Sequence, residues 1–410
     1  MSPAATTKKQ YRRGTHRTRS PAETIARFGA HARELGITRI ANVTGLDYLG
    51  IPVFMSIRPN SQSLAVSQGK GIDEAAAKAS ALMESIELAH AERVPRPARK
   101  ASYVHVSGRA RAVNPALLPR LKTGSVTKDS TFAWVRGTDL MDGQEIWVPY
   151  DVVHTNFASQ AKRGQTVFYC SRNGLASGNH LIEATCAALY EVIERDATAL
   201  WELKDKREQA RRRLVSESVR DPDCRALLDQ LEERGMSVAV WDVTTDIGVA
   251  AFSCRLKEAP GNERSDLRAF CGAGCHLSRE VAFIRAVTEA AQSRLTYIAG
   301  SRDDLYRRYY QKQASSPLFA HVHDVWERQL AGTRFNDVPS AAGSSFEADR
   351  DLLLEKLRAV GIRQVAVVDL TDERFGIPVV RVIAPGLECE PAHSPVRPGA
   401  RARAHSVGRV

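Results

Sequence analysis

The chain has 410 residues, of which 43% are hydrophobic and 26% are charged, a composition typical of a globular protein with one large core or several smaller ones. It has no apolar run of the roughly 18 residues that a membrane span requires, and no apolar segment follows the basic residues at its start, which argues against a secretory signal. The seven cysteines are an odd number and are scattered, so we expect a reducing, cytoplasmic setting.

The net charge of +11 is concentrated in the two tails of the chain. Residues 1–20 carry six basic residues and residues 391–410 carry four arginines, in both cases without an acid. The body between them is therefore close to neutral, which argues against a nucleic-acid-binding surface. We predict that residues 1–20 and 389–410 are disordered basic tails and that residues 21–388 form a single domain.

Three segments of the body share one strand pattern: ITRIANVTGLDYLGIPVFMSIRP (37–59), MSVAVWDVTTDIGVAAFSCRL (236–256) and IRQVAVVDLTDERFGIPVVRVIAPG (362–386). Each has a run rich in β-branched residues, a loop with threonine, aspartate and glycine, and a second such run. We predict three strand–loop–strand units with antiparallel pairing. Chance similarity among strands is the alternative.

A second set of three segments has the period of a helix, at 69–92, 177–197 and 272–294. Each has a glycine before the main helical pattern and then an acidic or acid–amide pair spaced three residues apart. Because such residues share a helix face, each helix presents its pair on one side. The pairs are Glu84 with Glu87, Glu191 with Glu194, and Glu289 with Gln292.

The middle helix carries its acids with almost no neighbouring cations. At about 100° per residue, Glu183, Glu191 and Glu194 fall within roughly 80° of one another, away from an apolar stripe. A solvated face is the alternative interpretation, but such a face usually interleaves opposite charges, and here only Arg195 follows, at the end of the row. The threefold repetition favours one site built from three helices.

Carboxylate and amide oxygens around one space suit a hard divalent cation such as Mg²⁺, which proteins commonly bind together with substrate phosphates. Helix starts led by glycine offer backbone N–H groups to phosphate, and arginines such as Arg195 and Arg285 offer bidentate contacts. These features predict a magnesium–nucleotide site. The GKG stretch at 69–71 is not a P-loop, because the leading glycine and the following Ser/Thr are missing.

The stretches SALMESIE (80–87), NGLASGN (173–179) with EVIER (191–195), and RAVTEAAQSR (285–294) resemble the ordered motifs of the YcaO domain family, over a match from about Thr24 to about Leu387. The resemblance implies an α+β (mixed α/β) ATP-binding fold with antiparallel strand pairs and three Gly-led acidic helices, and ATP and Mg²⁺ as cofactors. By the same resemblance the ATP-binding residues would be Arg17, Thr24, Ser80, Asn179, Arg195, Arg285 and Gln292. The metal-binding residues would be Glu84, Glu87, Glu183, Glu191, Glu194 and Glu289.

The sequence departs from the family pattern in two places. Leu88 stands where much of the family has an arginine, so one phosphate contact would be missing or supplied elsewhere. The chain also lacks the alternating P-x-P-x-P ending of azoline-forming members, since its last prolines are Pro391, Pro395 and Pro398. The stretches GNHLIEA, GAGCH and AAQSRLTYIAGSRDDL instead resemble the subgroup that acts with a TfuA-like partner and is linked to peptide thioamides.

The resemblance implies an ATP-dependent enzyme of ribosomal-peptide modification that activates, by O-phosphorylation, a backbone amide of a peptide or protein substrate, with a TfuA-like partner and a thioamide product. An azoline-forming cyclodehydratase and a non-catalytic ATP-binding accessory factor for ribosomal-protein methylthiolation stay open, as does RNA binding by the tails, which we favour least. We name no general base, although His90, His180 and His276 are candidates. We expect no membrane partner, and we leave a homodimer open.

Overall fold

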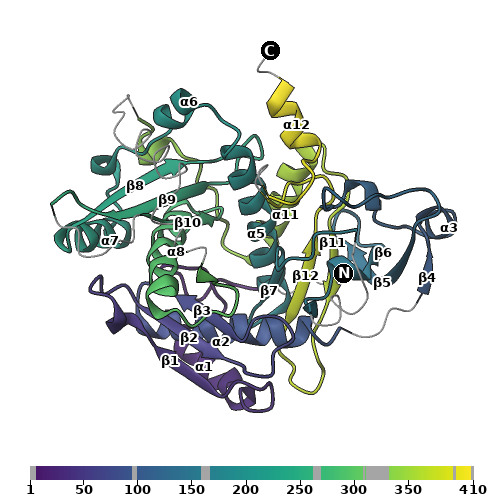
Figure 1. The fold of residues 1–410 in the computed structure, drawn as a ribbon, viewed down its shortest axis with the longest axis horizontal. Helices are drawn as coiled ribbons and strands as arrows, with labels where there is room; N and C mark the ends of the chain where they lie inside the picture. Colours follow the sequence, from purple (N-terminus) through teal and green to yellow (C-terminus); the bar gives the residue numbers. More distant parts are fainter. Residues whose placement is uncertain are drawn as a thin grey trace.

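The computed structural model describes residues 6–94, 99–157, 167–261, 269–307, 310, 332–390 and 394–407. Helices and antiparallel sheets alternate along these parts of the chain, so the predicted mixed α+β class is confirmed. In these ranges the strands form two three-stranded sheets and one six-stranded sheet (Figure 1).

The first sheet begins with the strand–loop–strand unit predicted at 37–59. β1 (Arg39–Asn42) pairs antiparallel with β2 (Val53–Ile57), which in turn pairs with β3 (Val66–Lys70). The chain leaves β3 through a short turn and enters α2 (Glu74–Ala91), which packs on β3 and β2. Three strands and the helix that follows them thus make one structural unit.

The second sheet repeats this unit. β8 (Met236–Asp242) and β9 (Ala251–Glu258) form the antiparallel pair predicted at 236–256, and β10 (Ala269–Cys275) pairs with β9. The chain then enters α8 (Arg279–Ala299), which packs on β10 and β9. As in the first unit, the third strand leads into the helix that covers the sheet.

The third unit is assembled from two distant parts of the chain. β11 (Ala366–Asp369) and β12 (Val379–Ile383) form the antiparallel pair predicted at 362–386, and β12 pairs with β7 (Leu175–Ser177). α5 (Leu181–Trp201) follows β7 and packs on both β12 and β7. The strand pair therefore follows its helix in the sequence, although it has the same place in the unit.

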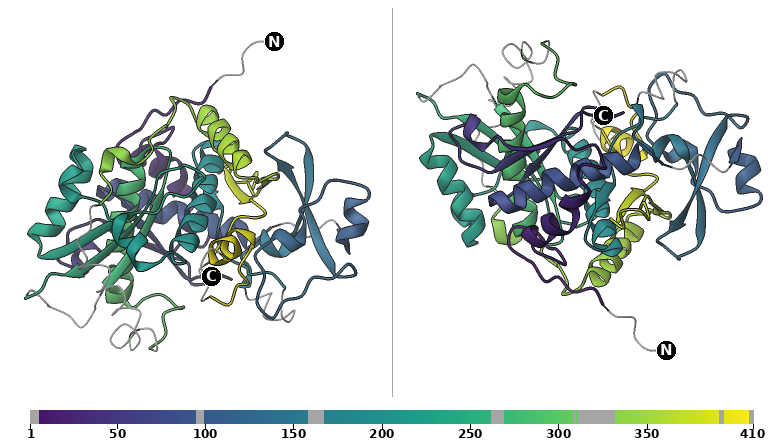
Figure 2. Two further views of the ribbon diagram at one scale, coloured as in Figure 1. Left: turned by 90° about the horizontal axis from the view of Figure 1, so that it is seen from above. Right: turned by 90° about the horizontal axis from the view of Figure 1, so that it is seen from below.

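The remaining strands extend the third sheet to one side. β4 (Arg99–Ser102), β5 (Thr131–Asp139) and β6 (Glu145–Pro149) continue it beyond β11. With α3 (Tyr103–Ser107) they form a lobe that projects from the body, whereas α2, α5 and α8 surround the centre of the molecule (Figures 1 and 2).

In the described part of the chain, several shorter helices lie around the three units. α1 packs against α2, α7 against β8 and α8, and both α11 and α12 against α5. In the described residues we find no helix that combines the length and the apolar character of a membrane span. The bounds of these helices are Pro21–Phe28 (α1), Lys206–Arg211 (α6), Pro222–Glu233 (α7), Phe346–Ala359 (α11) and Ala400–Val407 (α12).

In each of the first two units, a glycine in the third strand allows the helix to lie directly on the sheet. A Cβ atom at Gly69 in β3 would come within 2.0 Å of the Ala81 nitrogen, and one at Gly272 in β10 within 2.2 Å of the Ala286 oxygen. Such distances are far inside van der Waals contact, so only glycine permits this approach. The glycines therefore bring the helix backbones, and the side chains on them, toward one another.

This result corrects one step of the sequence argument. The glycines were expected to precede open helix starts that donate N–H groups to phosphates. Instead, the first turns of α2, α5 and α8 are capped by the side chains of Asp73, His180 and Ser278. A carboxylate at the start of α2 would repel a phosphate, so the reason for the glycines is close packing.

Substituting Gly69 by alanine is expected to lower the free energy of unfolding by about 1–3 kcal/mol, the usual cost of forcing extra atoms into a packed contact. The matched control is Gly45→Ala, because a Cβ at Gly45 would have no atom within 4 Å. Urea unfolding of both variants measures the difference. Equal midpoints would mean that α2 lies farther from β3 than the structure shows.

Residues 6–20, which we call the N-terminal strap, contradict the prediction of a disordered tail. The Lys9 ammonium lies 2.5 Å from the Asp349 carboxylate on α11, and both side chains are almost fully buried. His16 is also buried, with its ring edge-on against His276 at 4.8 Å between ring centres. Buried contacts of this kind cannot be recognised from the basic composition of the segment.

Residues 394–407 at the other end also contact the body. The Arg401 Nε atom donates to both carboxylate oxygens of Asp196 on α5, at 2.9 and 3.1 Å, and Val396 forms a bridge with Leu121. The prediction of disorder is therefore wrong for this stretch too, whereas residues 1–5, 391–393 and 408–410 lie outside the described part of the chain. The assignment of residues 21–388 to a single domain stays a prediction.

Candidate functional site

A cavity of about 960 Å³ lies among α2, α5 and α8. The structure brings every residue that the sequence predicted for the site to the lining of this cavity, although their roles stay predictions. They are Arg17, Thr24, Ser80, Asn179, Arg195, Arg285 and Gln292, together with Glu84, Glu87, Glu183, Glu191, Glu194 and Glu289.

The acids of α2 and α8 are paired with cations from other parts of the chain. The Lys70 ammonium, at the end of β3, lies 2.6 Å from Glu289 Oε2 on α8. Arg172, in the segment before β7, forms an ion pair with Glu84 on α2. The spacing along one helix could not predict these pairs, because their cations lie on other elements of the chain.

The acids of α5 lie farther from their counter-charges than the acids of α2 and α8 do. Arg195 Nη2 lies 4.0 Å from Glu191 Oε1, and Arg285 Nη2 lies 3.8 Å from Glu194 Oε2. Within the described residues, Glu194 Oε2 and Arg285 Nε are buried and have no hydrogen-bond partner. Buried polar atoms normally have one, so this donor and acceptor fit a phosphate oxygen and a hard cation, respectively.

The pKa of Glu87 indicates an excess of negative charge in the cavity. Its carboxylate accepts from the Ser177 nitrogen at 2.9 Å and from Ser177 Oγ at 2.7 Å. Burial nevertheless raises the pKa of Glu87 to about 8, and repulsion from Glu84 and Glu191 adds to this. Burial also raises the pKa of Glu191. A divalent cation would favour the charged form of these carboxylates, so the donor set fits Mg²⁺.

The N-terminal strap joins the site at the start of α5. The Thr18 nitrogen and Oγ1 donate to Glu183 Oε2 at 2.8 and 2.6 Å, and Arg17 Nε lies 3.8 Å from Glu183 Oε1. Asn179 Nδ2 donates to Thr24 Oγ1 at 3.0 Å. Arg17 and Thr24, which the resemblance assigned to ATP binding, therefore lie beside the start of α5. Because Glu183 already accepts these bonds, its geometry suits holding the strap better than binding a metal.

Several cavity residues escaped the sequence analysis, namely Lys70, Tyr169, Arg172, Arg302, Asp304 and Glu390. A signal for two of them was present. Lys70 lies in the GKG stretch and Arg172 directly precedes NGLASG, and the acidic faces required counter-charges from elsewhere in the chain. Arg302 and Asp304 lie in the AAQSRLTYIAGSRDDL stretch, which resembles the TfuA-associated subgroup but gave these two residues no predicted role.

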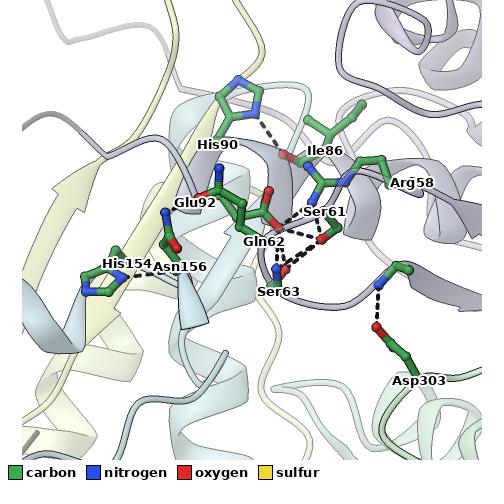
Figure 3. A network of polar contacts seen from close by, with 11 residues as sticks. Arg58, Ser61, Gln62, Ser63, Ile86, His90, Glu92, His154, Asn156 and Asp303 are labelled. Atoms are coloured by element: carbon green, nitrogen blue, oxygen red, sulfur yellow. Dashed lines mark hydrogen bonds and ion pairs between the residues drawn. The ribbon is translucent and has the colours of Figure 1, made fainter. Parts of the chain in front are cut away.

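The three histidines proposed as general bases have other surroundings. None of them is among the described residues that line the cavity. His90 Nδ1 lies 2.8 Å from the Ile86 oxygen near the end of α2 (Figure 3), and His180 Nδ1 accepts from the Ile182 nitrogen as the cap of α5. Burial lowers the pKa of His276 well below its usual value. The structure supports none of the three as the base.

Figure 3 also shows an acid directly after α2 that contacts a neighbouring loop. Glu92, at the end of the helix, lies 2.5 Å from Arg58 Nη2 and accepts from Ser61 Oγ at 2.7 Å and from the Ser63 nitrogen at 3.0 Å. These bonds anchor the loop that precedes β3. One oxygen of Glu92 thus accepts from several nearby donors, and Glu92 is not among the described residues that line the cavity.

Carboxylates from three helices, together with arginines and a lysine at one cavity, define the class of proteins that bind a nucleotide through magnesium. The model of the YcaO cyclodehydratase family, described as binding ATP and Mg²⁺, matches residues 68–388. The chain belongs to the YcaO family, and ATP and Mg²⁺ are the cofactors of that family.

Two relatives in other organisms match nearly the whole chain. A protein in the tfuA 3′ region of Rhizobium leguminosarum bv. trifolii is 36% identical over 390 residues, covering 93% of this chain and 91% of its own. A protein of Methanothermobacter thermautotrophicus is 34% identical over 371 residues, covering 90% and 94%. The first similarity supports the predicted TfuA-associated subgroup.

Solved structures show the same fold. YcaO from Methanopyrus kandleri, bound with AMPPCP and Mg²⁺, has a TM-score of 0.73 and 25% identity, covering 93% of this chain and 95% of its own. A heterocyclase in complex with substrate and cofactor has a TM-score of 0.76 and 20% identity. This chain spans about half of that heterocyclase, at 54% of its length, and 94% of this chain is covered.

Proposed function

We propose that this protein uses ATP and Mg²⁺ to activate a backbone amide of a peptide by O-phosphorylation, for thioamide formation together with a TfuA-like partner. The observation that carries the proposal is the cavity in which carboxylates of α2, α5 and α8 meet. The similarity to a protein in a tfuA 3′ region supports the thioamide product and the partner. The stretches that resemble the TfuA-associated subgroup support the same partner.

The reaction requires no covalent nucleophile from the protein. Hydrosulfide adds to the amide carbonyl carbon, and the resulting oxyanion attacks the γ-phosphorus of ATP with release of ADP. Loss of the phosphorylated oxygen as inorganic phosphate, together with a proton, leaves a carbon–sulfur double bond. The protein contributes mainly orientation and charge neutralisation.

The structure suggests how the chain divides this work. Magnesium would neutralise the phosphates of the nucleotide, and its ligands would be drawn from Glu84, Glu87, Glu191, Glu194 and Glu289. Arg195 and Arg285 would donate to phosphate oxygens. Ser80, Asn179 and Gln292 would supply neutral polar contacts to the nucleotide, with Arg17 and Thr24 closing the site from the N-terminal side.

An azoline-forming cyclodehydratase is the second candidate, because the matching family model carries that description. In that reaction a Cys, Ser or Thr side chain of the peptide replaces hydrosulfide as the nucleophile, and the peptide loses water. The similarity to the protein in the tfuA 3′ region favours the thioamide over the azoline.

The test is mass spectrometry of synthetic peptides incubated with the protein, MgATP and sulfide, with and without a TfuA-like protein. Exchange of oxygen for sulfur, accompanied by stoichiometric phosphate release, is the expected result. Loss of water from the peptide would establish the cyclodehydratase instead. ATP binding without any peptide-dependent phosphate release would favour the accessory factor.

A further inference from the structure

The three structural units are joined around the cavity by a ring of ion pairs. Lys70 of the first unit contacts Glu289 of the second, at 2.6 Å. Arg285 of the second unit faces Glu194 of the third, at 3.8 Å. The segment before β7, which belongs to the third unit, returns to the first through the pair of Arg172 with Glu84. In each case, a cation of one unit thus faces an acid of the next unit.

These pairs occupy the carboxylates that the proposed magnesium site needs. Glu289 Oε2 already has the Lys70 ammonium as its neighbour. A magnesium ion bound at the usual distance of about 2.1 Å from this oxygen would stand close to the ammonium and repel it. Lys70 and magnesium therefore compete for Glu289, and the same holds for Arg172 and Glu84.

A bound nucleotide would resolve this competition, because its phosphates offer new partners for the displaced cations. The Lys70 side chain is flexible, donates in three directions and lines the cavity. Leu88 stands where much of the family has an arginine, and it is 1% exposed and belongs to the apolar core. The phosphate contact of that arginine is then either missing or supplied by a cation from another element.

We propose that Lys70, with Arg172 as its counterpart, substitutes for magnesium on the carboxylates of the unloaded protein and transfers to the phosphates when the magnesium–nucleotide complex binds. Lys70 is then a phosphate-binding residue that the family motifs do not reveal. It also prevents metal from binding before the nucleotide. This inference rests on the proposed placement of the nucleotide and metal.

The proposal predicts opposite effects of one substitution on two binding equilibria. Lys70→Gln removes the competitor from Glu289, so Mn²⁺ alone, measured by electron paramagnetic resonance, should bind several-fold more tightly. The same change removes a charged donor to phosphate, so calorimetry should show MgATP binding about tenfold or more weaker. Lys70→Arg should retain MgATP binding.

The matched control is Lys78→Gln. Lys78 lies on α2 and is not among the described residues that line the cavity. It should alter neither equilibrium. Weaker binding of both Mn²⁺ and MgATP by Lys70→Gln would overturn the proposal and indicate a structural role, and so would unchanged binding of either one. If Lys70→Gln does not fold, Arg172→Gln should show the same opposite pair of effects.

The outcome for the wild type separates this inference from the site assignment. If the wild-type protein does not bind MgATP, the proposed nucleotide site fails. If the wild type binds MgATP and the Lys70→Gln variant behaves like it, the site survives and only the transfer of Lys70 is refuted.

Discussion

Replacing both Glu191 and Glu194 by glutamine is expected to weaken magnesium-dependent ATP binding by about 100-fold or more. Loss of a residue that merely supports a metal ligand already costs about 10–100-fold, and here two proposed ligands lose their charge. Glutamine retains the size of glutamate, so the contacts with Arg195 and Arg285 are weakened without opening a hole in the protein. Isothermal calorimetry with and without Mg²⁺ measures the effect.

The control for this experiment is Glu355→Gln, at an exposed position of α11 that is not among the described cavity residues. It removes one negative charge from the protein and should leave ATP binding unchanged. If the double variant binds MgATP as the wild type does, the acidic face of α5 does not hold the metal. The proposed mechanism would then lose its main support.

Replacing Lys9 by methionine is expected to lower the free energy of unfolding by about 3–5 kcal/mol, the usual cost of leaving one partner of a buried ion pair alone. The Asp349 carboxylate would keep its bonds from the Tyr190 hydroxyl at 2.9 Å and the Gly343 nitrogen at 2.7 Å. Among the described side chains that contact the Asp349 carboxylate, Lys9 supplies the only positive charge, and the variant removes it. Urea unfolding measures the loss.

The neighbouring residue provides the matched control. Lys8→Met removes the same charge from an exposed position and should have little effect, as surface charges contribute little to stability. The double variant Lys9→Met/Asp349→Leu should recover much of the stability, since no buried charge is then left alone. Equal midpoints for Lys8→Met and Lys9→Met would show that the strap is not anchored in solution.

The variant also tests whether the N-terminal strap belongs to the binding site. Arg17 and Thr18 reach Glu183 from the same segment that Lys9 anchors. A loosened strap should therefore weaken MgATP binding in Lys9→Met, and Arg17→Gln should reproduce this effect without the loss of stability. Unchanged nucleotide binding in both variants would restrict the strap to a structural role.

The repeated patterns predicted the strand pair and the helix of each unit, but not its third strand. Alternating β-branched runs around a polar loop predicted the antiparallel pairs at 37–59, 236–256 and 362–386, because both halves of each pair are local in sequence. The acidic helix faces were predictable for the same reason, since a face depends only on spacing along one helix.

The counter-charges of the acids were not predictable in this way. Lys70 and Glu289 are far apart in the sequence and meet because α8 of the second unit lies beside β3 of the first. Arg172 reaches Glu84 in a comparable manner. No pattern along a single element contains such a pairing, so the sequence did not predict the cations that neutralise Glu84 and Glu289.

The order of the tails was missed for a related physical reason. Basic composition predicts solvated disorder when no partner for the charges is known. Lys9 has its partner on α11 and Arg401 has its partner on α5, both remote in sequence. A single buried acid in the right place reverses a prediction that was drawn from composition.

By itself, the sequence determined the three antiparallel strand pairs, the three acidic helices and the side chains that share one face of each of these helices, because these depend on local spacing and on the backbone preferences of neighbouring residues. Only the tertiary structure decided that the strand pair near the end of the chain completes the sheet under α5, and that cations from one unit neutralise the acids of the next. These contacts join residues that are distant along the chain, and they form only when the three units pack around one cavity.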